Sequence, residues 1–146
     1  MKMLHNPDSR ADFERRLAAL NPKSQRRWGT MSVDQMLWHV NATFLLHLGE
    51  IKALRKKNPL PRSVMKFLVL NFPWPKSLPT LAPLVAKHRY KFCNERQRCL
   101  QLINRFATKR LDEVWPENPV FGKVSGTFVS RLQAKHLDHH LRQFGV

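Results

Sequence analysis

The sequence predicts an all-α fold, a four-helix bundle with a proline-rich crossover. Only 5 of the 146 residues are glycine, and Leu, Ala, Lys, Arg and Gln dominate the long segments, which favours helices over strands. Four segments repeat apolar residues at helical spacing, whereas residues 72–83 hold four prolines and must be extended. With 42% hydrophobic residues the chain can form one packed core, so we expect a single domain over residues 1–146.

The first helix is expected within the segment "DSRADFERRLAAL". Asp8 or Ser9 can cap its start, because a short polar side chain accepts a hydrogen bond from an amide of the first turn. One Phe and two Leu then recur at helical spacing. Asn21 and Pro22 end the helix, because a residue that precedes proline avoids the helical conformation.

The second helix has stronger signals at both ends. Ser32 is followed three residues later by Gln35, which is the spacing of a capping box. The segment "VDQMLWHVNATF" then places its apolar residues along one stripe. Gly49 follows as a natural stop, since glycine readily adopts the left-handed conformation that ends many helices.

A basic connector rich in proline separates the second helix from the rest of the bundle. A short helix is expected in "RSVMKFLVLN", followed by the extended loop over residues 72–83. We expect a long third bundle helix over roughly residues 81–109. Ser125 or Thr127 caps the last helix, which runs through "GTFVSRLQAKHLDHHLRQF".

The chain is strongly basic, with 26 Lys and Arg, 10 Asp and Glu, and a net charge of +16. Such a charge attracts polyanions, but it does not separate a nucleic-acid binder from a basic enzyme with an anionic substrate. No helix-turn-helix, zinc-finger or RRM signature is present, and the 4 tryptophans are scattered. A nucleic-acid-associated binding protein without catalysis is therefore kept as the alternative function.

The sequence contains no membrane or export signal. The N-terminal residues lack the apolar stretch of a signal peptide. The most apolar piece, "SVMKFLVLNFPW", is far shorter than the roughly 18 apolar residues of a membrane span. We therefore expect a cytoplasmic protein with no membrane partner. A homodimer fits the size of such a bundle, although no self-complementary patch can be read from the sequence.

Three histidines lie close together in the terminal segment "AKHLDHHLRQFGV". His136 and His140 are four residues apart, so on a helix they point within about 40° of each other. Two imidazoles placed in this way can reach one cation, as in helical zinc motifs. His139 points about 100° away from His140 and does not share that face.

Two ligands hold a divalent metal poorly, so a third must come from another helix. The best candidate is His39, which lies in the middle of the second helix beside its apolar stripe. The alternative is a histidine at the edge of the core that is hydrogen-bonded to a neighbour. His47 lies eight residues further on, about 12 Å along the helix, which is too far for the same ion. The histidines alone do not distinguish zinc from nickel.

Several stretches resemble the DinB-like superfamily of metal-binding four-helix bundles. They are "WGTM", "MSVDQMLWHV", "NPVFGKVSGTFVSRL" and "KHLDHHLRQFG", and the resemblance spans roughly residues 10–146. The last stretch is similar to an uncharacterised subfamily that ends in HLDHHLRQFG. Many DinB proteins end in H-R-G-Q, where this chain reads His140-Leu141-Arg142-Gln143, so the glutamine keeps its spacing and the glycine is absent.

The resemblance implies a DinB-type bundle and a divalent metal, zinc or nickel. The matching ligand positions are His39, His136 and His140. Three neutral imidazoles that leave one coordination position open can support a metal-dependent transferase or hydrolase. Some DinB-like families are thiol-dependent, so the resemblance implies a small thiol as a possible substrate. The basic charge allows an anionic substrate instead, or is simply a solvated basic face. A scaffold whose metal is structural or lost is a third possibility.

No catalytic residue can be named beside the expected ligands. Asp34 and Asp138 lie on the wrong helical faces to act as a general base at this site. Gln133 lies three residues before His136, and Gln143 lies three residues after His140. These glutamines can orient an imidazole or a water molecule, or they can be solvated residues on the flank of a helix.

Overall fold

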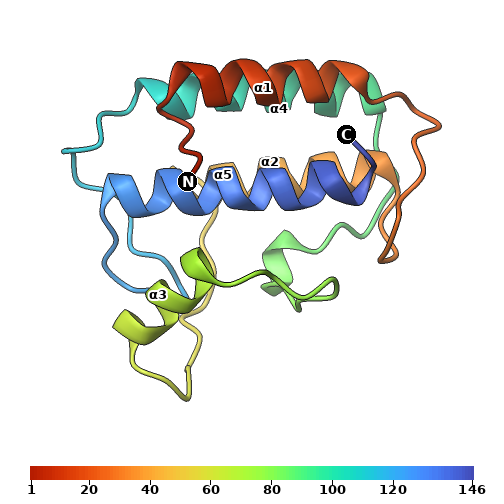
Figure 1. The fold of residues 1–146 in the computed structure, drawn as a ribbon. Helices are drawn as coiled ribbons and strands as arrows, with labels where there is room; N and C mark the ends of the chain where they lie inside the picture. The colour runs from red at the N-terminus through yellow and green to blue at the C-terminus, as the bar shows by residue number, and fades with distance from the viewer.

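The computed structural model describes residues 1–146 and consists of helices joined by loops, without a strand (Figure 1). The elements are α1 (Pro7–Ala19), α2 (Val33–His47), α3 (Arg62–Asn71), the 3-10 turn η1 (Ala82–Leu84), α4 (Phe92–Thr108) and α5 (Gly126–Gln143). Four of these helices, α1, α2, α4 and α5, form a bundle. The prediction of an all-α bundle is therefore confirmed.

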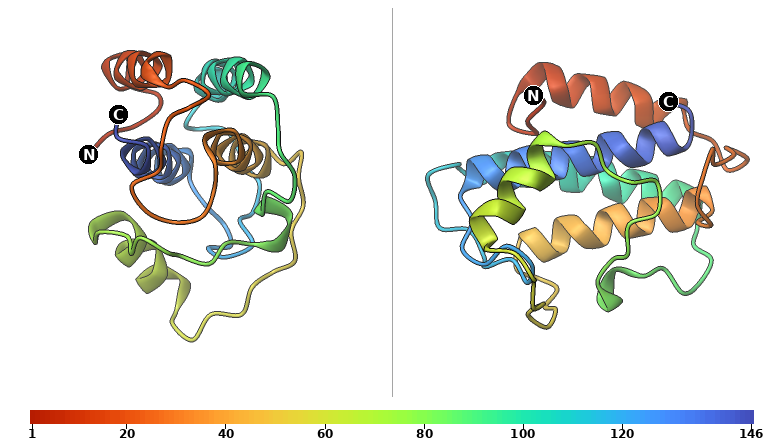
Figure 2. Two further views of the ribbon diagram at one scale, coloured as in Figure 1. Left: turned by 90° about the vertical axis from the view of Figure 1, so that its right-hand side faces the viewer. Right: turned by 60° about the horizontal axis from the view of Figure 1, so that its bottom comes forward.

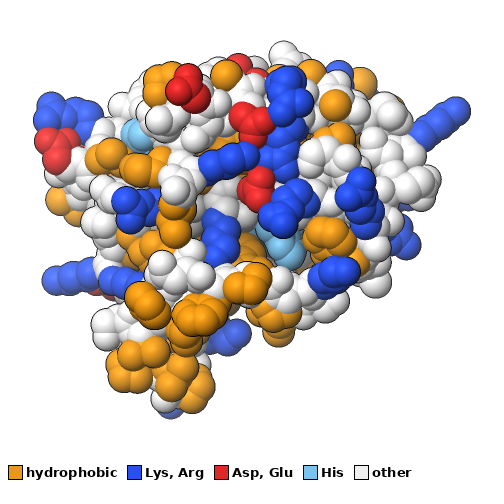
Figure 3. Space-filling model, viewed as in Figure 1, with side chains coloured by type: hydrophobic (Ala, Val, Ile, Leu, Met, Phe, Trp, Pro, Cys, Tyr) orange, Lys and Arg blue, Asp and Glu red, His pale blue; other side chains and the backbone are white.

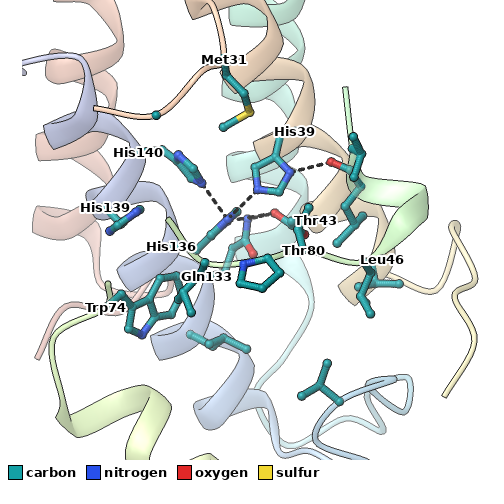
Figure 4. A pocket seen from close by; sticks show the side chains of 18 of the residues that line it. Met31, His39, Thr43, Leu46, Trp74, Thr80, Gln133, His136, His139 and His140 are labelled. Carbon is teal, nitrogen blue, oxygen red and sulfur yellow. Dashed lines mark hydrogen bonds between the residues drawn. The ribbon is translucent and has the colours of Figure 1, made fainter. Parts of the chain in front are cut away.

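The bundle has two layers, α1 beside α4 and α5 beside α2, as the end-on view shows (Figure 2). The apolar core fills the space between the layers. Phe13 of α1, Phe44 of α2 and Phe106 of α4 are completely buried there, together with Leu137 of α5. The opposite faces of α2 and α5 point away from this core, and the histidines lie on that side (Figure 4).

The helix starts largely follow the sequence signals. The capping box of Ser32 and Gln35 opens α2, and the Ser125 hydroxyl accepts a hydrogen bond from the Phe128 amide at 3.1 Å to open α5. The expected cap of the first helix is wrong, because α1 is capped by Asn6 rather than by Asp8 or Ser9. The Asn6 side chain accepts from the Ser9 amide, and Pro7 begins the helix with a backbone angle already suited to it.

Residues 51–91, which we call the cap, cross the outer side of α2 and α5 (Figure 2). The cap contains α3, the proline-rich loop and η1, and Leu84 is its one buried residue. The ammonium group of Lys135, on α5, holds the end of α3 by donating to the carbonyls of Val69, Leu70 and Phe72 at 2.6–3.0 Å. None of the helices combines the length and the apolar character needed to cross a membrane.

The expected long helix over residues 81–109 is wrong in its first part, because α4 begins only at Phe92. Contacts with α2 hold the preceding residues in an extended path. The Asp34 carboxylate accepts hydrogen bonds from the Tyr90 amide at 2.8 Å and from the Arg89 guanidinium at 3.0 and 3.1 Å. The Leu84 carbonyl accepts a hydrogen bond from the His39 side chain of α2. The Leu84 carbonyl and the Tyr90 amide are therefore both unavailable for the hydrogen bonds of a continuous helix.

Candidate metal centre

His39 of α2 meets His136 and His140 of α5 on the side of the bundle that the cap covers (Figure 4). The Nε2 atom of His136 lies 3.0 Å from Nε2 of His39 and 3.1 Å from Nε2 of His140. One ring nitrogen of each residue lies within 4.8 Å of the others, an arrangement that can hold a metal ion. The structure therefore brings together the three histidines that the sequence analysis selected.

A main-chain carbonyl determines which ring nitrogen of His39 carries the proton. Its Nδ1 atom lies 2.7 Å from the Leu84 oxygen in η1. A carbonyl can only accept, so Nδ1 carries the proton and donates it. Nε2 of His39 is consequently left with a free lone pair that points toward the other two rings.

Thr43 places the proton of His136 on Nδ1 as well. The Thr43 hydroxyl donates its only proton to the Val40 carbonyl at 2.7 Å. Its oxygen then accepts from Nε2 of Gln133 at 2.9 Å and from Nδ1–H of His136 at 3.2 Å. His136 therefore also presents an unprotonated Nε2.

Gln143 places the proton of His140 on Nδ1 in the same way. Its Nε2 donates to the Trp28 carbonyl at 2.9 Å, which leaves Oε1 to accept from Nδ1–H of His140 at 2.8 Å. The amide can come this close because residue 29 is glycine. A Cβ atom on Gly29 would lie 2.7 Å from Nε2 of Gln143, and the φ angle of +78° is one that other residues rarely adopt.

The three hydrogen bonds leave three nitrogen lone pairs directed at one another. Lone pairs about 3 Å apart repel, and a cation between them turns that repulsion into attraction. Zinc with bonds of about 2.0 Å holds its imidazole nitrogens about 3.3 Å apart in a tetrahedron, close to the two short separations found here. The donor set and its hydrogen-bonded partners thus fit a divalent metal ion.

The local environment also favours the neutral rings that metal binding requires. Burial lowers the pKa of His39, and burial lowers the pKa of His140 to about 3. The pKa of His136 lies well below its usual range, first because of burial and then because His140 and His39 are close. No proton therefore has to leave these rings at neutral pH before an ion can bind.

A cavity of about 850 Å³ adjoins the histidines, between the α2–α5 face and the cap. Its wall is largely apolar and includes Leu84 and Phe121. None of its lining residues is acidic, whereas Lys56 and Lys76 line it from the cap. The cavity is therefore suited to a partly apolar molecule that carries negative charge.

The other two histidines of these helices also line the cavity but do not join the cluster. The ring of His139 packs against Trp28 and Trp74, with centroids 5.6 Å away in each case. This position agrees with the expectation that His139 does not share the face of His136 and His140. His47 is buried at the far end of α2, where burial lowers its pKa to about 4.

The two glutamines were left open by the sequence analysis, and the structure gives each a role. Gln143 orients His140 directly, and Gln133 supports Thr43, which orients His136. Neither is solvated, since Gln133 is fully enclosed and Gln143 is 3% exposed. Thr43 was missed, although it lies one helical turn after His39 on the same face, a spacing that could have identified it.

The acidic residues stay out of the site, as expected. Asp34 is occupied by Arg89 and the Tyr90 amide. Asp138 forms an ion pair with Arg16 of α1, with the guanidinium nitrogen 2.7 Å from its carboxylate. The cluster is therefore assembled from histidines, and its supporting groups are neutral oxygens.

An all-α bundle with three histidines on the cap-covered faces of two of its helices defines the class of this protein. A family model of the DinB superfamily matches residues 8–144, nearly the whole chain. The chain therefore belongs to the DinB superfamily. No curated protein and no solved structure matches it. The narrower resemblance through the ending HLDHHLRQFG stays a prediction.

Proposed function

We propose that this protein binds a divalent metal ion, zinc or nickel, through His39, His136 and His140. We also propose that residues 1–146 act as one domain. The observation that carries the metal proposal is the set of three Nδ1–H donors, each bound to its own oxygen, which leaves three Nε2 lone pairs facing one another. Three imidazole ligands leave a coordination position open, which is typical of catalytic rather than structural sites.

We infer a metal-dependent transferase or hydrolase whose substrate is a small thiol or another anionic molecule. When bound, such an ion acidifies a water molecule or stabilises a thiolate. Other features of the chain fit such a reaction. Thr43 and Gln143 keep their imidazoles in fixed orientations, and the largely apolar cavity wall can pack against apolar parts of a substrate. Lys56 and Lys76 supply positive charge for an anionic substrate.

The metal content of protein purified without a histidine tag tests this proposal. We expect about one equivalent of metal per chain in the wild type and almost none in His140→Ala. The matched control is His139→Ala, which removes the neighbouring imidazole from the same helix but from a different face. Equal metal content in wild type and His140→Ala would show that the ligand set is wrong.

A second measurement separates a bound ion from an adventitious one. A ligand present at about 100 times its Kd stabilises the folded state by about 2.7 kcal/mol. We therefore expect added zinc to raise the Tm of the wild type and of His139→Ala, and a chelator to reverse the change. The Tm of His140→Ala should not respond to either. A zinc response in all three proteins would point to binding elsewhere.

The alternative function, binding of nucleic acid without catalysis, is supported by the net charge of +16. The tryptophans do not favour it as a base-stacking surface. Trp38 is stacked on Tyr90 and Trp115 packs against Phe106, so both rings are already in use. This function predicts binding of DNA or RNA that weakens steeply with salt, and no binding at about 50 mM salt would exclude it.

A further inference from the structure

We propose that the cap is a docking surface for a lipid bilayer that contains anionic headgroups. The first observation is where the exposed apolar side chains lie. Of the ten large hydrophobic residues that the protein exposes, eight belong to the cap, and only Met1 and Val114 lie elsewhere. Scattered single residues of this kind need no explanation, but their concentration in one segment indicates an interaction site.

Five of these residues form one continuous face, which we call the α3 apolar face. They are Leu60, Val64, Phe67, Leu68 and Phe72. Val64, Phe67 and Leu68 share one side of α3, Leu60 and Phe72 flank its two ends, and the rings of Phe67 and Phe72 lie 6.3 Å apart. Phe67 is 60% exposed and Phe72 is 53% exposed, and no residue of α3 is fully buried. The helix therefore turns this face toward solvent, while Met65, Val69 and Leu70 on its other side pack against the core.

The charged residues of the cap itself are all of one sign. Between Glu50 and Glu95 the chain has ten Lys or Arg residues and no Asp or Glu. Arg55 and Lys57 are exposed in the connector that leads into α3. Apolar side chains flanked by cations are the composition of segments that lie in the interface of an anionic membrane, where each cation adds about 1 kcal/mol of attraction.

The shape of the surface distinguishes a bilayer from a peptide partner. α3 projects from the lower edge of the molecule, and its apolar side chains cluster on that projection (Figures 1 and 3). A peptide is usually bound in a groove, whereas a protruding helix with phenylalanines can insert into the headgroup region. A second copy docked through the same face would bring the cations of the two caps together, which opposes self-association.

This proposal changes the expectation that the protein has no membrane partner. That expectation rested on the absence of a spanning segment, and no helix of the structure can span. Lying on a membrane has different requirements, namely an amphipathic helix and basic residues. The cap meets both. Docking would also bring the lipid surface close to the cavity, because the cap forms part of the cavity wall.

Co-sedimentation of the full-length protein with vesicles tests the proposal. We expect binding to phosphatidylcholine vesicles with about 30% phosphatidylserine to exceed binding to pure phosphatidylcholine about tenfold or more. The double variant Phe67→Ser, Phe72→Ser should weaken binding to the anionic vesicles about tenfold, because two buried rings are lost. The double variant Arg55→Glu, Lys57→Glu should weaken it by a similar factor.

Each variant has a matched control outside the cap. Val114→Ser removes an apolar side chain that is 91% exposed, and Lys23→Glu with Arg98→Glu makes the same charge change on exposed sites. Both controls should bind vesicles like the wild type. All substituted side chains are exposed, so folding and metal content, checked by circular dichroism and metal analysis, should be unchanged.

Three results would overturn the proposal. The first is no preference for anionic vesicles over neutral ones. The second is that the protein binds RNA and loses this binding in Arg55→Glu, Lys57→Glu, whereas Phe67→Ser, Phe72→Ser still binds both RNA and vesicles. This pattern would indicate a nucleic-acid surface, which does not need the phenylalanines. The third is a dimer of the wild type that Phe67→Ser, Phe72→Ser converts to a monomer, since the α3 apolar face would then contact a second copy.

Discussion

The bundle encloses its phenylalanines, with Phe13, Phe44 and Phe106 fully buried, whereas the cap leaves Phe67 and Phe72 more than half exposed. The two regions also differ in charge, because all 10 acidic residues of the chain lie outside the cap. The bundle positions the histidines on rigid helices, and the cap contributes the two lysines, one carbonyl and part of the cavity wall. The fold and the positions of the three histidines thus depend on the bundle, whereas the cap orients His39 and closes one side of the cavity.

The largest expected effect tests this division directly. Phe44→Ala leaves a hole in a closed core, so we expect a loss of about 3–5 kcal/mol in the free energy of unfolding. Phe67→Ala removes the same atoms from a side chain that is 60% exposed, and the expected loss is below about 0.5 kcal/mol. Urea unfolding measures both. A loss above about 2 kcal/mol for Phe67→Ala would mean that the cap is part of the stable core.

A smaller effect concerns pH and the buried residue His47, which lies on the bundle side of the cavity. Burial lowers the pKa of His47 from its usual 6.5 to about 4, so the unfolded chain takes up the proton first as the pH falls. The stability that the neutral ring contributes is complete above pH 6.5 and is lost toward pH 4. Between pH 7.5 and pH 5 this loss is about 2 kcal/mol.

The variant His47→Gln isolates this contribution, because it keeps a polar side chain that does not titrate. We expect its free energy of unfolding to fall less than that of the wild type between pH 7.5 and pH 5, by about 2 kcal/mol. Denaturant unfolding of metal-free protein at both pH values gives the difference. Parallel curves for the two proteins would mean that His47 is accessible to water when the chain is folded.

The smallest effect concerns the contact between Lys135 of the bundle and the end of α3 in the cap. Lys135→Met keeps the aliphatic stem but removes the three hydrogen bonds to the end of α3. We expect a loss of about 1 kcal/mol in overall stability and faster amide hydrogen exchange confined to the cap. The matched control is Arg131→Met, one turn earlier on α5 and exposed, which should change neither. Faster exchange throughout α5 would show that Lys135 stabilises the bundle instead.

Much of the fold could be predicted because local signals and tertiary contacts agree. Ser32 and Gln35 form the expected capping box, and Ser125 caps α5. The prediction failed for residues 81–91, where helical spacing competes with longer-range contacts. Asp34, on α2, binds the Tyr90 amide and holds that segment extended, which no local pattern in the segment indicates.

In the candidate site, the three histidines could be predicted from the sequence, but the groups that orient them could be predicted only in part. His136 and His140 follow from helical spacing, and His39 follows from its place beside the apolar stripe of α2. The groups that orient them are harder to predict. Thr43 and Gln143 are near the histidines on their own helices, so spacing can suggest them. The carbonyl of Leu84 comes from 45 residues away along the chain, and its position depends on how the cap folds back.

That carbonyl has a consequence for protein engineering. Every residue carries a main-chain oxygen, so the hydrogen bond to His39 depends on the path of η1, which the buried Leu84 side chain holds against Ala42 and Leu46 of α2. The exposed residues Ala82 and Pro83 of the turn can therefore be replaced while Leu84 and its oxygen stay in place. Transplanting the three histidines into another bundle without such a turn would leave the ring of His39 free to rotate, and its affinity for metal would fall.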